Sequence, residues 1–222
     1  MDAEIKYAPA FATLFVTLQP GESIVAESDA MASMSPHLEI HTRFNGGFFN
    51  AILRKLFGGE TLFINEFVCP ADGPPAELVL TQPTPGDVTQ VDLRGNSLLL
   101  QPGAFVACSP GVTMTLGWAG FSSWFNREGL FRLKVSGQGP VWIGGYGGIT
   151  TRQVTGSYIM DTGHILAYEP TIHLKVGLAG GIFSSFFGGE GFVTRLSGQG
   201  KVYMQSRSMD SLASWTNTHL PF

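Results

Sequence analysis

Residues 183–200, "FSSFFGGEGFVTRLSGQG", decide the expected fold because residues 121–139, "FSSWFNREGLFRLKVSGQG", repeat nearly the same pattern. Each segment contains paired serines and aromatic residues, a turn with a glutamate, a short apolar run and a Ser-Gly-Gln-Gly turn. One copy alone looks like a glycine-rich ligand loop that carries an acid. Two copies favour an aromatic segment, a turn and a strand that end a structural repeat, in which the glycines serve turn geometry.

Two further landmarks precede this segment and extend the repeat to three copies. One is a turn leading into an apolar strand, and the other is a strand that starts at a proline and alternates apolar with polar residues, as half-buried strands do. Between the second and third copies the offset is 60 residues at Gly103 and Gly163 and 62 residues at Glu128 and Glu190. The landmarks read "LQPGESIVA" (18–26), "LQPGAFVA" (100–107) and "MDTGHILA" (160–167), then "PHLEIHT" (36–42), "PGVTMTL" (110–116) and "PTIHLKV" (170–176).

The pattern predicts an all-β protein with little helix. Short strands separated by glycine and proline favour a β-sandwich, a barrel or a β-helix-like roll. Helical spacing of apolar residues occurs only from Phe48 to Phe57. No linker separates the copies, so we expect a single domain, residues 1–222. Its three repeats span about residues 10–95, 96–155 and 156–207, followed by a short C-terminal tail, residues 208–222.

Composition limits the possible partners. Hydrophobic residues make up 44% of the 222 residues, which is enough for a substantial core, and charged residues make up only 14%. The 29 glycines are about twice the usual share and indicate many tight turns. The net charge of -4 gives no electrostatic reason to bind phosphate backbones, so no nucleic-acid partner is expected.

Targeting signals and cysteine usage point to the cytoplasm. The N-terminus, "MDAEIKYAPA", has acidic residues where secretory and organelle signals need basic ones. The longest apolar stretch, Ala10 to Leu18, is about half of the ~20 residues that a membrane-spanning helix needs, so no transmembrane segment is expected. Cys69 and Cys108 lie 39 residues apart without a Cys-x-x-Cys spacing, which favours buried thiols but leaves one disulfide open.

Longer motifs along the chain resemble a known family. They are "LQPGESIVAESDAM" (18–31), "GGETLFINEF" (58–67), "PGDVTQVDL" (85–93), "MDTGHILAYE" (160–169) and "FFGGEGFVTRLSGQGKVYMQSRS" (186–208). Together, over roughly residues 1–207, they resemble the bacterial relatives of the altered inheritance of mitochondria twenty-four proteins. The tail, "MDSLASWTNTHLPF", departs from the family, which leaves Trp215 and Phe222 either to dock or to fray.

The resemblance implies a fold more than a function. It implies double-stranded β-helix-like units, repeated in one chain, similar to the fold of the trp RNA-binding attenuation protein. It implies no established biochemical activity for the bacterial members. For the mitochondrial member it implies a link to inner-membrane organisation and not to catalysis. Function therefore has to be argued from sites.

Two short motifs suggest chemistry. Asp161, Thr162 and Gly163 match the aspartic-protease signature, but that site needs a second carboxylate, and the repeat places these residues at an ordinary turn. His37, Glu39 and His41 alternate along an expected strand, so their side chains share a face and could bind zinc. The matching positions of the other copies are typical of a solvent-facing strand, so we favour that interpretation.

Three glutamates recur at one position of the repeat: Glu60, Glu128 and Glu190. If the copies pack around a common axis, these carboxylates could form a site for a hard cation. A turn-forming residue precedes each of them, which favours side-chain-to-backbone hydrogen bonds within the turn. The Gly-x-Gly turns lack the remaining residues of phosphate loops, and no Gly-x-Ser-x-Gly motif occurs. We therefore expect neither a cofactor nor an enzymatic activity.

Aromatic side chains gather near these glutamates. They are expected to cap the open ends of the β units as part of the core. Where exposed, they would contact another subunit, a protein partner or a membrane surface, and Arg54 and Lys55 flank the first group. The candidate contact residues are Phe48, Phe49, Phe57, Trp124, Phe125, Phe186 and Phe187.

These observations favour a non-catalytic, cytoplasmic scaffold or protein-interaction protein that forms homo-oligomers, because repeated β units expose edges that association can cover. Peripheral membrane contact stays open. The first alternative is a small-ligand or RNA-binding module, which rests on the fold resemblance and has the acidic balance against RNA. The second is a metal-dependent enzyme that uses His37, Glu39 and His41.

Overall fold

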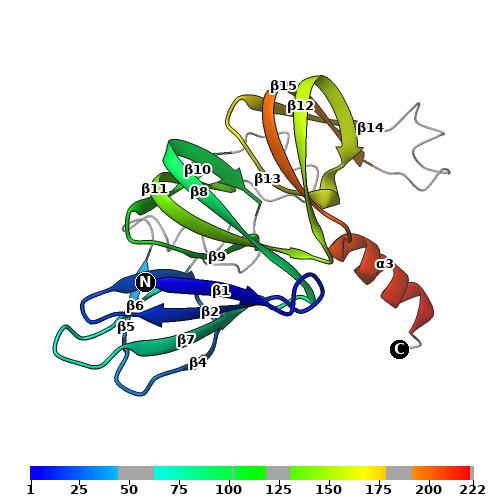
Figure 1. The fold of residues 1–222 in the computed structure, drawn as a ribbon. Coiled ribbons are helices and arrows are strands. Elements are labelled where there is room, and N and C mark those ends of the chain that lie inside the picture. Colours follow the sequence, from blue (N-terminus) through cyan, green and yellow to red (C-terminus); the bar gives the residue numbers. More distant parts are fainter. Residues whose placement is uncertain (45–62, 102, 119–130, 179–191, 221–222) are drawn as a thin grey trace.

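A computed structural model describes residues 1–44, 63–101, 103–118, 131–178 and 192–220. Within these ranges the chain forms fifteen strands, one α-helix and a short 3-10 turn, so the prediction of an all-β protein is confirmed. The strands follow one another in three groups, β1–β7, β8–β11 and β12–β15, and α3 projects beside the last group (Figure 1). The predicted helical stretch, Phe48 to Phe57, lies outside the described residues.

The first group contains a sheet of its own. Its strand order is β1-β2-β7-β4, and neighbouring strands are antiparallel. Along β2, Leu14, Val16 and Leu18 are buried and alternate with half-buried residues, which is the period-2 pattern of a sheet with one face on the core. The bounds are β1 (Asp2–Lys6), β2 (Thr13–Leu18), β4 (Met31–Met34) and β7 (Ala76–Thr81).

A second sheet of eleven strands runs through all three groups. Nine strands follow the order β12-β15-β13-β8-β11-β9-β3-β6-β5, while β10 pairs with β11 and β14 pairs with β15. Their bounds are β3 (Ser23–Glu27), β5 (Glu39–Phe44), β6 (Phe63–Val68), β8 (Gly86–Leu100), β9 (Phe105–Cys108), β10 (Val112–Trp118), β11 (Phe131–Tyr146), β12 (Ile149–Asp161), β13 (Ile165–Tyr168), β14 (Ile172–Leu178) and β15 (Phe192–Gln205).

The second and third groups pair their strands in corresponding ways. β11 pairs with β8, β9 and β10, and β15 pairs with β12, β13 and β14. The registers also correspond, because Leu133 lies opposite Leu100 while Thr194 lies opposite Met160. Met160 in β12, 60 positions after Leu100, is therefore the structural counterpart of Leu100 in β8.

The Ser-Gly-Gln-Gly segments lie inside the long strands, not at their ends. Gly137 in β11 and Gly198 in β15 have φ angles of +128° and +121°, which residues with a side chain rarely adopt. A Cβ atom at either position would overlap a backbone carbonyl oxygen, that of Gly111 or Thr171 respectively. These glycines let β10 and β14 pair closely with β11 and β15 as antiparallel neighbours. The prediction that these segments form turns is therefore wrong, because both lie within paired strands.

Different strand pairs join the three groups. β3 meets β9, with Ala26 opposite Ala107, and β8 meets β13, with Leu100 opposite Ala167. These four residues are fully buried, at 0% exposure, and the small alanine side chains let the sheet layers pack closely around them. The buried hydrophobic residues form three clusters: the first includes β2 and β7, the second includes β8, β9 and β11, and the third includes residues of β13 and β15.

The tail forms a helix that the sequence analysis did not predict. Helix α3 (Met209–His219) begins after Ser208, whose hydroxyl accepts a hydrogen bond from the Ser211 N–H. Asp210 in its first turn and His219 in its last turn both suit the helix dipole. Serine, threonine and asparagine obscured the apolar periodicity, and the helix contains no buried residue.

Candidate functional site

The structure separates His37 from the other two residues of the zinc site that the sequence offered as the alternative to a solvent-facing strand. The ring nitrogen Nε2 of His37 lies 3.1 Å from the carbonyl oxygen of Pro74. His41 Nε2 lies instead 3.3 Å from Glu39 Oε2, and both of these side chains are more than half exposed, at 53% and 58%. In the part of the chain that the structure describes, no three His, Cys, Asp or Glu side chains are placed to hold a metal ion.

Other predicted site residues lie outside the described residues. These are the recurrent glutamates Glu60, Glu128 and Glu190 and the aromatic contact candidates Phe48, Phe49, Phe57, Trp124, Phe125, Phe186 and Phe187.

The Asp-Thr-Gly motif forms a local turn. Thr162 to His164 is a 3-10 turn, η2 (Thr162–His164), and Asp161 Oδ1 accepts a hydrogen bond of 2.8 Å from the Gly163 N–H. The carboxylate thus caps the turn, as Asp does before a helical turn. This geometry gives Asp161 a structural role at the end of β12.

A groove of about 400 Å³ lies between α3 and the adjoining ends of β11 and β15. Its lining residues on the helix include Ser211 and Leu212, which lie four and three residues before Trp215 and are therefore its neighbours on the helix surface. Sequence analysis missed this site because α3 itself was missed. The sequence did contain a signal for the start of this helix, which is Ser208 as a capping residue followed two residues later by Asp210. The groove is lined by Tyr146, His164 and Arg207 from the strands and turns and by Ser211, Leu212 and Trp215 from the helix.

Gln205 holds the strand side of the groove together. Its amide nitrogen donates to the Gly163 carbonyl at 2.8 Å, and its amide oxygen accepts from the Tyr146 N–H at 2.9 Å. The Gln205 backbone carbonyl lies 2.8 Å from His164 Nδ1. Because a carbonyl oxygen can only accept a hydrogen bond, His164 Nδ1 carries a hydrogen and donates it to this carbonyl. Tyr146, His164 and β15 are therefore fixed relative to one another.

Arg207 brings a permanent positive charge to the groove. Its backbone N–H donates to the Tyr146 carbonyl at 3.2 Å, which fixes the position of its backbone beside β11. Among the described residues, Arg207 forms no ion pair and no acidic side chain lines the groove. The groove therefore combines a cation with hydroxyl and imidazole groups and with the apolar surfaces of Leu212 and Trp215.

The profile of the family described as "Mitochondrial biogenesis AIM24" matches residues 3–207, which is most of the chain. The chain belongs to this family. An uncharacterized protein of Streptococcus pyogenes serotype M6 is 26% identical over 222 residues, covering 95% of this chain and 88% of that protein. A crystal structure of a Streptococcus pyogenes protein has the same fold, with a TM-score of 0.79 and 23% identity over 99% of both chains.

The match to the AIM24 family ends at Arg207, immediately before the helix cap. The strand side of the groove is thus made of residues within the family match, whereas α3 lies beyond it. No helix in the described part of the chain is long and apolar enough to cross a membrane.

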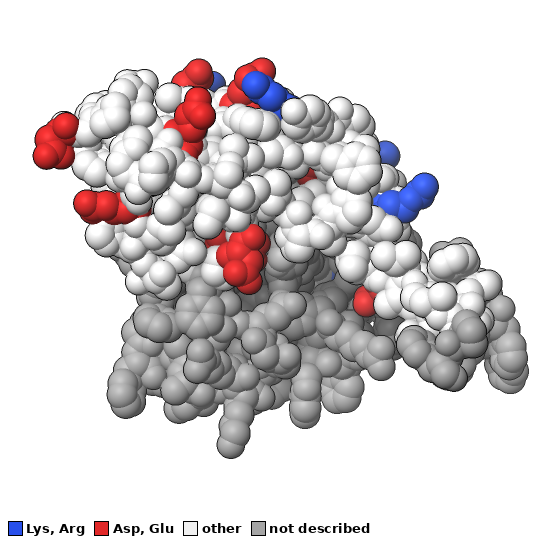
Figure 2. Space-filling view, turned by 90° about the horizontal axis from the view of Figure 1, so that it is seen from below, with Lys and Arg blue, Asp and Glu red and all other residues white. Residues whose placement is uncertain are grey.

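Charge is distributed unevenly along this AIM24 family member. Residues 1–95 contain 12 acidic and 5 basic residues, whereas residues 96–222 contain 5 acidic and 8 basic residues. Figure 2, seen from the side of the N-terminal strands, shows mainly acidic side chains among the described charged residues. The groove beside α3 belongs to the more basic half of the chain.

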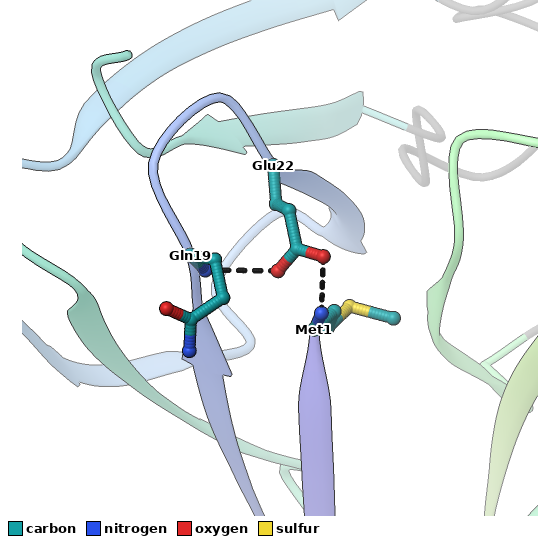
Figure 3. Close-up of polar contacts among 3 residues, drawn as sticks. All are labelled: Met1, Gln19 and Glu22. Atoms are coloured by element: carbon teal, nitrogen blue, oxygen red, sulfur yellow. Dashed lines mark hydrogen bonds and ion pairs between the residues drawn. The ribbon is translucent and has the colours of Figure 1, made fainter. Parts of the chain in front are cut away.

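Among the described residues, Glu22, Cys108 and Tyr203 have shifted pKa values. The Met1 amino group and the Gln19 N–H both hydrogen-bond the Glu22 carboxylate and lower its pKa below the ordinary 4.5 (Figure 3). Burial raises the pKa of the Cys108 thiol to about 12. Burial and the nearby Glu169 carboxylate raise the pKa of Tyr203. Cys69 and Cys108 are both buried free thiols, so the disulfide that the sequence left open does not form.

Proposed function

We propose that the protein is a non-catalytic scaffold that self-associates through the open edge of β12. A single structural comparison carries the proposal: β13 pairs with the C-terminal end of β8, at Leu99 and Leu100, whereas the corresponding strand β12 has only β15 as a neighbour among the described strands. An uncovered strand edge presents backbone N–H and C=O groups that can pair with another strand.

An exposed apolar side chain, Ile159, lies in the same stretch of β12. In β8, Leu99 and Leu100 lie opposite Tyr168 and Ala167 of β13. By the corresponding registers, their counterparts in β12 are Ile159 and Met160. Ile159 is 50% exposed, whereas its counterpart Leu99 is half-buried. Met160 is half-buried, whereas its counterpart Leu100 is fully buried. The exposed isoleucine is the apolar side chain that pairing with a further strand would cover.

A second copy of the chain is the partner that fits this edge. Antiparallel pairing of β12 with its own copy around a two-fold axis covers both open edges at once and closes the assembly as a dimer. It also joins the less acidic halves of the two chains, because β12 carries one basic and one acidic residue, Arg152 and Asp161, and residues 1–95 hold most of the acids.

The scaffold proposal includes the architecture expected from the family resemblance. The corresponding pairings of β8–β11 and β12–β15 support repeated units within a single domain, residues 1–222, similar to the double-stranded β-helix. A cytoplasmic location is part of the same proposal. The groove beside α3 supports a second, small-ligand function that is developed below.

Size-exclusion chromatography with light scattering tests the proposed dimer. Ile159→Lys places a charge on the exposed edge, and lysine is a residue that natural sheets use to prevent edge pairing. Gln199→Lys adds the same charge to an exposed position of β15, which is an interior strand between β12 and β14, and is the matched control. We expect a dimer for the natural chain and for Gln199→Lys and a monomer for Ile159→Lys.

Two outcomes contradict the proposal. A natural chain that stays monomeric over the micromolar range excludes self-association of useful strength. A dimer that survives Ile159→Lys shows that the contact lies elsewhere. Circular dichroism of each variant checks that the sheet is retained, which is expected because Ile159 is half exposed.

A further inference from the structure

The geometry points to the groove beside α3 as a binding site for a small organic anion with an apolar body, in which a carboxylate or phosphate contacts Arg207 and the body lies against Leu212 and Trp215. This inference is independent of the proposed dimer, since the groove is built from β11, β15, η2 and α3, and β12 does not line it.

The size of the groove suits a small molecule. Ligand pockets in proteins commonly span roughly 300–1,000 Å³, and the groove measures about 400 Å³. A ligand of this size buries part of its own apolar surface and also covers exposed protein surface. Leu212 is 40% exposed and Trp215 is 61% exposed, so both side chains have apolar area that contact with a ligand would remove from water.

The charge of the groove selects an anion. The Arg207 guanidinium is always protonated and presents several N–H donors in a planar arrangement that fits the two oxygens of a carboxylate or phosphate. The Tyr146 hydroxyl and the Ser211 hydroxyl, which form no side-chain hydrogen bond among the described residues, can also donate. No acidic side chain is among the described residues that line the groove, and the two nearest acids in the chain, Asp161 and Asp210, lie at the cap of η2 and in the first turn of α3.

The strand side of the groove is already organised for binding. The Gln205 side chain forms hydrogen bonds both to Tyr146 and to the turn that contains His164. The Arg207 backbone N–H donates a hydrogen bond to the Tyr146 carbonyl. Ser208, only 5% exposed, caps α3 and fixes where the helix starts. The rest of α3 has no buried residue, so the apolar wall of the groove is the part that ligand contact would stabilise.

Fluorine NMR of protein labelled with 5-fluorotryptophan provides a local test. Trp215 lines the groove, while Trp142 is 1% exposed in the core and serves as an internal reference in the same sample. Trp215→Phe assigns the signal. The probes are benzoate, phenyl phosphate, inorganic phosphate and the uncharged benzyl alcohol. We expect saturable shifts of the Trp215 signal with at least one of the two aromatic anions, and none of the Trp142 signal.

Matched variants separate specific binding from general charge effects. Arg207→Gln removes the cation from the groove, and Arg195→Gln makes the same change at an exposed position of β15 that does not line it. Losing a charge-assisted hydrogen bond should weaken binding by about tenfold or more. We therefore expect that loss with Arg207→Gln, no change with Arg195→Gln, and binding of benzyl alcohol at least about tenfold weaker than that of the anions.

The remaining outcomes are also decisive. Saturation by benzoate alone identifies carboxylates as the ligand class, and saturation by phenyl phosphate alone identifies phosphate esters. The inference is overturned if neither aromatic anion produces a saturable shift below about 10 mM. It is equally overturned if Arg207→Gln binds as tightly as the natural chain, or if inorganic phosphate or benzyl alcohol binds as tightly as the aromatic anions.

Discussion

Replacing Gly198 by alanine should destabilise the protein because the backbone at this position cannot accept a side chain. The φ angle of +121° lies where residues other than glycine are strained by roughly 1–3 kcal/mol. The added Cβ would also overlap the Thr171 carbonyl oxygen at the start of the β14–β15 pairing, where Ile172 lies opposite Gly198. Displacing that strand loses at least one backbone hydrogen bond, or about 1 kcal/mol. The expected loss in the free energy of unfolding is therefore about 3 kcal/mol.

Differential scanning calorimetry measures this loss. For a chain of this length, about 3 kcal/mol corresponds to a fall in Tm of about 6–12 °C. Gly177→Ala is the control, because Gly177 is exposed in β14, directly beside the same strand, and a Cβ there meets nothing within 4 Å. We expect it to change stability by at most about 0.5 kcal/mol, with the sign favouring alanine. Equal Tm values for the two variants would refute the argument from backbone geometry.

Two other predictions follow from the shifted pKa values. Because burial raises the pKa of Cys108 to about 12, only about one Cys108 thiol in ten thousand is ionised at pH 8, and Ellman's reagent should label it quickly only after denaturation. Rapid labelling of Cys108 in the folded protein would contradict its burial. Because the folded pKa of Glu22 is lowered, its stabilising contact with Met1 is present above the unfolded pKa near 4.5 and is lost as the pH falls through the folded value. Glu22→Gln should therefore reduce the free energy of unfolding by about 0.5 kcal/mol or less at pH 7, since solvent reaches the contact and screens it, and by nothing near pH 3. Urea titrations that show the same difference at both pH values would exclude this ion pair as the cause.

Local sequence patterns were sufficient to predict the class of fold. Alternation such as that of Ile172 and Leu174 depends on the geometry of a single strand, so it could be predicted without knowing the partner strand. The recurrence of Gly137 and Gly198 also reported a real backbone constraint. The pattern around these glycines suggested a turn, however. Only the antiparallel pairing with β10 and β14 shows that they lie within the strands β11 and β15.

The alternating pattern of His37, Glu39 and His41 did not predict where these side chains lie, for a similar reason. Alternate residues of a strand share a face, but His37 precedes β5 and its ring meets the Pro74 carbonyl, 37 residues away in the chain. Tertiary contacts set the direction of such a side chain. The groove beside α3 was invisible because its strand side joins residues 146, 164 and 207 through Gln205, and no local pattern relates them.

The sequence by itself determined that this protein is all-β and belongs to its family, since strand periodicity, turn residues and long motifs are local properties of the chain. Tertiary structure decided which strands join the three groups, that β12 has only β15 as a neighbour among the described strands, and how α3 forms a groove with Arg207. These features depend on contacts between residues far apart in the chain. Their energies come from burial and from hydrogen bonds that exist only after the strands have paired.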